Sequence, residues 1–190
     1  MATDEAIKQS WGFHRVVSPK TASLQSAETV DNTPELLADT QTLIDVELLN
    51  LDSTSMRQLR STGQDVARAI LDIVARRGKQ HNPVTNSGGV LVGRVREVGS
   101  GVHAARGDST LRPGLPIIPV CSMTAIPLKL DKIISISGEQ VQVVGQAVLL
   151  GNYAYCAVPD DFTLETALAG KAIPVQSCVD IPEQTSACFL

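Results

Sequence analysis

The chain has 190 residues, a formal net charge of −4, and a composition that is 43% hydrophobic but only 3% aromatic. This length suits one domain of ordinary size and a little more, with a core built from aliphatic side chains. The acidic balance and the lack of a long basic run argue against nucleic acid as a partner. No apolar run approaches the ~20 residues that a membrane span needs, and no secretory segment opens the chain, so we expect a cytoplasmic protein without a membrane partner.

The first part of the chain predicts two strands and a short helix. Residues 13–17 are expected to form the first strand. Residues 42–49 predict the second, because acidic and apolar side chains alternate there with the period of a half-buried strand. Residues 53–60 are expected to form a turn of helix, with Met56 and Leu59 packing inward.

A longer helix is expected between Asp65 and Gly78. Asp65 is a suitable N-cap, and Gly78 is a suitable residue for ending the helix. Four apolar side chains share one face at helical spacing, and they are Val66, Ile70, Ile73 and Val74.

A polar loop over residues 81–89 precedes an alternating strand over residues 89–98. Gly88 and Gly89 permit backbone geometry and close approach that larger residues resist. Loops held by a rigid strand often contact small ligands, so this segment is a candidate binding loop. The alternative is a surface turn before an ordinary strand.

After residue 100 the sequence predicts mainly β structure, with a final helical pattern over residues 160–170. The expected strands cover residues 115–121, 128–136, 140–150 and 153–158. Short strands at this spacing suggest a barrel or a sandwich. Pro116 and Pro119 are expected to confine the first of them to a sheet edge or a bulge.

The four cysteines are scattered along the chain, at Cys121, Cys156, Cys178 and Cys188. None forms a C-x-x-C pair, and none has a histidine at ligand spacing, so a zinc site has little support.

Three motifs together resemble the L-erythro-3,5-diaminohexanoate dehydrogenase family of the medium-chain dehydrogenase superfamily. They are Leu49-Asn50-Leu51-Asp52-Ser53-Thr54-Ser55, Arg77-Gly78-Lys79, and Asn82-Pro83-Val84-Thr85-Asn86-Ser87-Gly88-Gly89. The resemblance extends from about Gly12 to about Ala167. It implies a fold that is mainly β with a few helices, namely a GroES-like, partly open β-barrel.

The resemblance also implies how the chain is divided. Residues 1–160 are expected to form the catalytic domain, and residues 161–190 a linker or helix toward a nucleotide-binding Rossmann domain. The sequence contains no G-x-G-x-x-G fingerprint, so we expect the Rossmann domain to be absent from this chain. By itself the chain is then expected to be inactive and to bind no NAD measurably.

The activity that the resemblance implies is an NAD- or NADP-dependent dehydrogenase of lysine fermentation. Such an enzyme oxidatively deaminates L-erythro-3,5-diaminohexanoate to 5-amino-3-oxohexanoate. The cofactor is expected to be bound mainly outside this chain, and the complete enzyme is a possible homodimer. Catalytic zinc is not expected, because Asp52 aligns with a ligand cysteine of zinc-using relatives and Gly88-Gly89-Val90 aligns with their Gly-His-Glu.

The candidate site residues follow from this alignment. Asp52 and Ser53 are the candidate catalytic residues, with Asp52 holding a substrate ammonium or taking a proton if burial raises its pKa. The candidate substrate-binding residues are Ser55, His81, Thr85, Asn86, Ser87, Gly88 and Gly89. The backbone N–H groups near the two glycines are expected to receive the substrate carboxylate. The partner is thus a small amino-acid substrate.

Each candidate has a structural alternative. Asp52 also suits a helix N-cap for residues 53–60. His81 is either a proton-transfer group or a solvated residue after a helix. Thr85 and Ser87 also suit hydrogen bonds within their own loop. Lys79 is a candidate contact for a carboxylate or a phosphate, although a charge past a helix end usually faces water.

A second class of function stays open at this stage. The chain is alternatively a non-catalytic GroES-like binding or assembly module, or an inactive truncated remnant, because a fold does not decide function.

Overall fold

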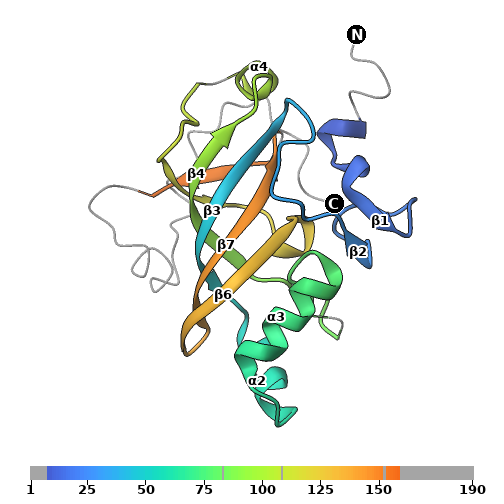
Figure 1. Ribbon diagram of the computed structural model, residues 1–190, viewed down its shortest axis with the longest axis vertical. Helices are drawn as coiled ribbons and strands as arrows, with labels where there is room; N and C mark the ends of the chain where they lie inside the picture. The colour runs from blue at the N-terminus through green and yellow to red at the C-terminus, as the bar shows by residue number, and fades with distance from the viewer. Residues whose placement is uncertain (1–7, 83, 108, 152, 159–190) are drawn as a thin grey trace.

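The computed structural model describes residues 8–82, 84–107, 109–151 and 153–158, and two antiparallel sheets dominate it (Figure 1). The small sheet pairs β1 (Val16–Ser18) with β2 (Thr29–Val30). The large sheet has six strands in the order β6-β7-β3-β4-β5-β8. Their bounds are β3 (Gln41–Asn50), β4 (Val90–Val98), β5 (Pro116–Pro119), β6 (Leu128–Ser137), β7 (Gln140–Leu150) and β8 (Tyr155–Ala157).

The helical elements are few and short, which confirms a fold that is mainly β with a few helices. They are η1 (Phe13–Arg15), α2 (Ser53–Ser61), α3 (Val66–Arg77), α4 (Val102–Arg106) and η2 (Met123–Ala125). Within the described residues the large sheet ends at β6 and β8 and does not close into a barrel. The predictions for residues 160–170 and 161–190 lie outside the described residues.

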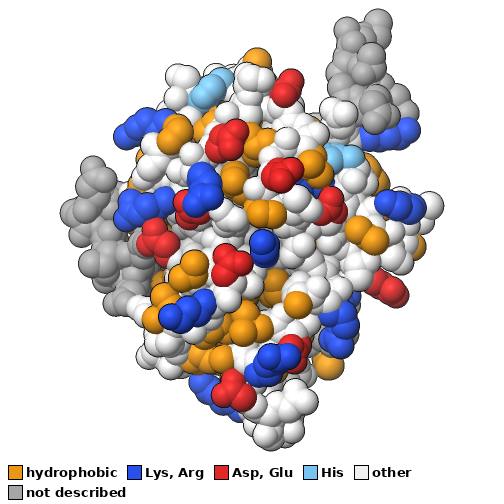
Figure 2. Space-filling view, in the orientation of Figure 1, with side chains coloured by type: hydrophobic (Ala, Val, Ile, Leu, Met, Phe, Trp, Pro, Cys, Tyr) orange, Lys and Arg blue, Asp and Glu red, His pale blue; other side chains and the backbone are white. Residues whose placement is uncertain are grey.

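Strand β3 lies at the centre of the large sheet and leads directly to the candidate site. It pairs with β7 on one side and β4 on the other, and the register shifts between Val46 and Leu48. Side chains on the exposed face form two cross-strand ion pairs, Arg94 with Glu47 at 3.0 Å and Arg96 with Asp45 at 2.9 Å. On the face shown in Figure 2, basic and acidic side chains are interspersed, and neither sign dominates.

Two predictions about the strands need correction. The prolines of β5 do not confine it to an edge, since β5 lies between β4 and β8. Pro116 and Pro119 stand at the two ends of this four-residue strand, where fewer ladder hydrogen bonds are required. The expected first strand begins only at Val16, because Phe13–Arg15 forms a 3-10 turn after Gly12, whose φ is 76°.

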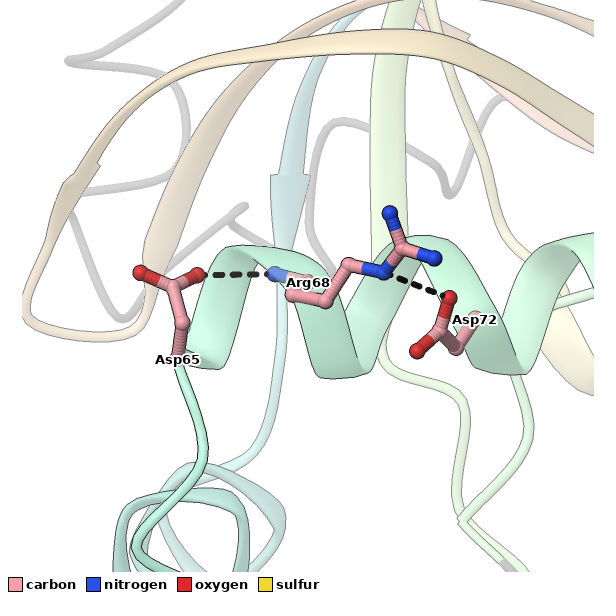
Figure 3. Close-up of polar contacts among 3 residues, drawn as sticks. All are labelled: Asp65, Arg68 and Asp72. Carbon is pink, nitrogen blue, oxygen red and sulfur yellow. Dashed lines mark hydrogen bonds and ion pairs between the residues drawn. The ribbon is translucent and has the colours of Figure 1, made fainter.

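Helix α3 has the ends that its sequence predicts, and two residues of the predicted face, Ile70 and Val74, are buried, whereas Val66 and Ile73 are half-buried. The Asp65 carboxylate accepts from the Arg68 N–H at 2.8 Å, and Arg68 pairs with Asp72 one turn later at 2.9 Å (Figure 3). Gly78 ends the helix with φ 71°, and a Cβ there would lie 2.0 Å from the Val30 carbonyl oxygen. Glycine is therefore required by both the backbone angle and the space.

The helices α2 and α3 cover one end of the large sheet, with α3 against β6 (Figure 1). Ile70 and Val74 of α3 are fully buried, and Met56 of α2 joins the same core cluster with Leu59 packed beside it. Burial of apolar side chains on this scale is the main stabilising term for the fold. The packing fixes the two segments that flank the candidate site, namely the start of α2 and the chain that leaves α3.

Candidate functional site

Asp52 lies between β3 and α2, one residue beyond Leu51, and is the N-cap of helix α2. One carboxylate oxygen accepts from the Ser55 N–H at 2.8 Å, and the other accepts from the Ser55 hydroxyl at 2.6 Å. Burial raises the pKa of Asp52, but hydrogen bonds from Ser55 and from the Ser87 hydroxyl outweigh it and hold the pKa below its ordinary value. Asp52 is therefore a carboxylate anion at neutral pH, which suits an ammonium contact and not proton uptake.

Asn82 connects this cap to the loop at residues 82–87. Its side-chain NH₂ donates to the Ser55 hydroxyl at 2.8 Å and to the Gln58 carbonyl at 2.7 Å. Its side-chain oxygen accepts from the Val84 N–H at 2.8 Å, and its own backbone N–H donates to the Ser87 carbonyl at 2.7 Å. Every hydrogen-bonding group of the amide is used, so Asn82 fixes the loop against α2.

The two glycines of the loop pack closely against neighbouring backbone. A Cβ on Gly88 would lie 2.5 Å from the Thr124 nitrogen, and one on Gly89 would lie 2.1 Å from the Asn50 carbonyl oxygen. Gly89 also has φ 74°, and its carbonyl accepts from the Met123 N–H at 3.0 Å. The glycines thus bring the loop against the end of β3, which places the Asp52 turn and the glycine turn side by side.

Two of the candidate side chains point to other partners. Ser53 is exposed, and its hydroxyl donates to the carboxylate of Glu139 in the turn between β6 and β7. Thr85 is also exposed, and its hydroxyl oxygen accepts from the Ser87 N–H within its own loop at 3.3 Å. The structure therefore joins Asp52, Ser55 and Ser87 in one network and leaves Ser53 and Thr85 outside it.

His81 and Asn86 line a pocket of about 420 Å³ together with Ser23, Gln25 and Ser26 of the segment between β1 and β2. The His81 Nε2 lies 3.1 Å from the Asn86 side-chain oxygen. Burial lowers the pKa of His81, and the charges of Arg77 and Lys79 lower it further, whereas the hydrogen bond with Asn86 raises it; the net effect is a pKa below the ordinary value, which favours the neutral ring.

Lys79 is fully buried, which corrects the expectation that it faces water. Its Nζ donates to the carbonyl oxygens of Leu24 at 2.5 Å and Gln25 at 2.9 Å, so it holds the segment that lines the pocket. Burial, with a further effect of the Arg77 charge, lowers the pKa of Lys79 to about 8.

The residues that link the site were not all recognised from the sequence. Asn82 and Gln58 were not among the candidates, although an asparagine before proline is a known signal for a turn.

Among the residues that the structure describes, no three His, Cys, Asp or Glu side chains gather as they would around a metal ion. The same part of the chain has no helix long and apolar enough to cross a membrane.

A nicotinamide dinucleotide does not fit the described elements by themselves. The dinucleotide-binding fold needs parallel strands joined by a helix, with a glycine-rich turn at the helix start. Every described strand pair is antiparallel, and the sequence has no G-x-G-x-x-G.

Comparison with known proteins shows that, over most of its length, the chain is similar to the N-terminal part of dehydrogenases. Residues 14–159 match the family described as the L-erythro-3,5-diaminohexanoate dehydrogenase N-terminal domain. The chain belongs to this family, which confirms the resemblance in the sequence.

Two curated relatives carry the name L-erythro-3,5-diaminohexanoate dehydrogenase. The protein of Fusobacterium nucleatum subsp. nucleatum is 38% identical over 165 residues, and that of Acetoanaerobium sticklandii is 36% identical over 165 residues. Each alignment covers 84% of this chain but 47% of the relative. The chain thus spans about half the length of these relatives.

Proposed function

We propose that the chain supplies the substrate-binding half of an NAD- or NADP-dependent dehydrogenase that oxidatively deaminates L-erythro-3,5-diaminohexanoate to 5-amino-3-oxohexanoate. The observation that supports this most is the family match over residues 14–159. The dinucleotide would be bound by residues outside the described part of the chain, because the described elements do not fit it.

The proposed roles of the chain's own residues follow from the hydrogen bonds at the site. Asp52 is held as an anion by Ser55 and Ser87, and a charge-assisted hydrogen bond from a substrate ammonium is its natural further contact. Asn82 acts as a positioning residue, because it fixes both Ser55 and the backbone next to Ser87. Ser53 and Thr85 contribute less in this arrangement, since their hydroxyls serve other partners.

A hybrid enzyme tests this proposal. Residues 1–159 of the chain are joined to the part of the Fusobacterium nucleatum relative that the alignment does not cover, and formation of reduced dinucleotide is followed with L-erythro-3,5-diaminohexanoate. In parallel, the chain alone is titrated calorimetrically with the same compound. We expect the hybrid enzyme to reduce NAD(P) only when L-erythro-3,5-diaminohexanoate is present.

The contradicting result is a hybrid that binds NAD(P) but reduces none of it, together with no heat of binding to the chain. That pair of results favours the non-catalytic module instead. Titration of the chain alone with NAD is expected to show no measurable binding, in either case.

A further inference from the structure

The turn between β6 and β7 contacts both residues that flank Asp52. Gly138 and Glu139 form this two-residue turn, which lies beside α2 at one end of the large sheet (Figure 1). The Glu139 carbonyl accepts from the Leu51 N–H at 3.0 Å, and the Glu139 carboxylate accepts from the Ser53 hydroxyl. One residue therefore holds the chain immediately before and immediately after Asp52.

A further hydrogen bond ties the same turn to the last part of α2. The Arg60 guanidinium donates to the Gly138 carbonyl at 2.7 Å. Ser53 and Arg60 are about two helical turns apart, so they lie on the same face of α2. The turn and that face of α2 thus form a closed set of contacts, and the helix cannot rotate or slide without breaking one of them.

These contacts fix the backbone around Asp52, whereas the network in the candidate site fixes its carboxylate. Ser55 and Ser87 bind the carboxylate oxygens, but neither holds the point where the chain passes from β3 into α2. A substrate contact depends on both, because displacement of a group by about 1 Å can lower a rate by ~100-fold. Ser53 is exposed and its hydroxyl could bond to water instead, so the fold does not need the Glu139 partner to satisfy a buried group.

We propose that Glu139 is a positioning residue for Asp52, binding the residues on either side of it so that its carboxylate meets the substrate ammonium. This inference rests on the proposed function, in which Asp52 makes that contact. Ser53, which the sequence suggested as a catalytic residue, then acts through Glu139 and not on the substrate. The role requires an acceptor oxygen on the Glu139 side chain and does not require its negative charge.

Two substitutions at Glu139 separate the acceptor from the charge. Glu139→Gln removes the charge but keeps a side-chain oxygen that accepts from Ser53, whereas Glu139→Ala removes both. Ser53→Ala removes the donor of the same bond, and Glu97→Ala, at an exposed position of β4, is the matched control. Amide hydrogen exchange at Ser55, whose N–H donates to Asp52, reports in the full chain how firmly the cap is held. The hybrid enzyme gives kcat/KM for L-erythro-3,5-diaminohexanoate.

We expect Glu139→Ala and Ser53→Ala to speed exchange at Ser55 and to lower kcat/KM, each by about threefold to tenfold, which is the effect of losing one hydrogen bond. Glu139→Gln and Glu97→Ala are expected to stay within about twofold of the wild type, and the double variant of Glu139 and Ser53 to lose no more than either single alanine variant.

Either quantity left unchanged in Glu139→Ala overturns the assignment. A loss of kcat/KM in Glu139→Gln that equals the loss in Glu139→Ala also overturns it, because the charge and not the acceptor would then matter. Faster exchange at Ser55 in Glu139→Ala, together with a wild-type hybrid that reduces no NAD(P), supports the positioning of Asp52 and counts against the proposed function.

Discussion

The buried ammonium of Lys79 predicts an unusual dependence of stability on pH. The pKa of Lys79 is about 8 in the folded chain, against 10.5 for a free lysine. Between these values the unfolded chain binds more protons than the folded chain, so this group makes the free energy of unfolding rise with pH. Linkage with these two values gives a rise of about 2.5 kcal/mol between pH 7 and pH 10, since one pKa unit corresponds to about 1.36 kcal/mol.

Lys79→Met isolates this contribution. The variant also leaves the carbonyls of Leu24 and Gln25 without their donor, at a cost of about 1–3 kcal/mol, but that cost is independent of pH. Urea unfolding of the wild type and of Lys79→Met at pH 7 and pH 10 gives the difference in their free energies of unfolding at each pH. Wild-type stability is expected to improve by about 2–3 kcal/mol relative to Lys79→Met over this range. Lys129→Met, on the exposed edge of β6, measures the background effect of losing one surface charge. A difference between wild type and Lys79→Met that does not change with pH would refute the reasoning.

Two further variants test the loop. Gly89→Ala should cost about 3 kcal/mol or more or prevent folding, because φ is 74° and the new Cβ would meet the Asn50 carbonyl oxygen. Gly63→Ala shares a positive φ but has open space around it, so thermal unfolding should show a cost of only about 1–2 kcal/mol; equal losses would contradict the close approach. Asn82→Ala should cost about 2–4 kcal/mol in chemical unfolding, because Ser55 and a second side chain of α2 lose their donor. A loss below about 1 kcal/mol would show that the loop does not depend on this amide.

Local sequence patterns were sufficient to predict the helices and strands whose caps and apolar spacing lie within the element itself. Helix α3 begins at Asp65 and ends before Gly78 as expected, because capping and apolar spacing are encoded within a few residues. Strands β6 and β7 lie within a residue of their expected bounds for the same reason. The interior position of β5 was not predictable, since its second neighbour, β8, lies far along the chain.

In the candidate site, too, some residues were predictable from local sequence and others depend on contacts between distant segments. The sequence singled out Asp52, Ser55 and Ser87, and the structure brings them together. The burial of Lys79 was not predictable, because its two acceptors lie 54 and 55 residues away in sequence. Asn82 was missed for the same reason, since its partner Ser55 is 27 residues distant. Contacts of this kind depend on how the segments pack and not on any local pattern.

The paired variants Asp52→Asn and Asp65→Asn in the hybrid enzyme test the proposed role of Asp52 most directly. Both aspartates are N-caps that accept a backbone N–H at 2.8 Å, and asparagine is an equally good cap, so each change removes a charge without removing the cap. Loss of a charged hydrogen bond to a substrate ammonium corresponds to about 1.5–3 kcal/mol, or at least about tenfold in kcat/KM. We expect that loss for Asp52→Asn with L-erythro-3,5-diaminohexanoate and less than about twofold for Asp65→Asn. Equal values of kcat/KM for the two variants would contradict a substrate contact at Asp52.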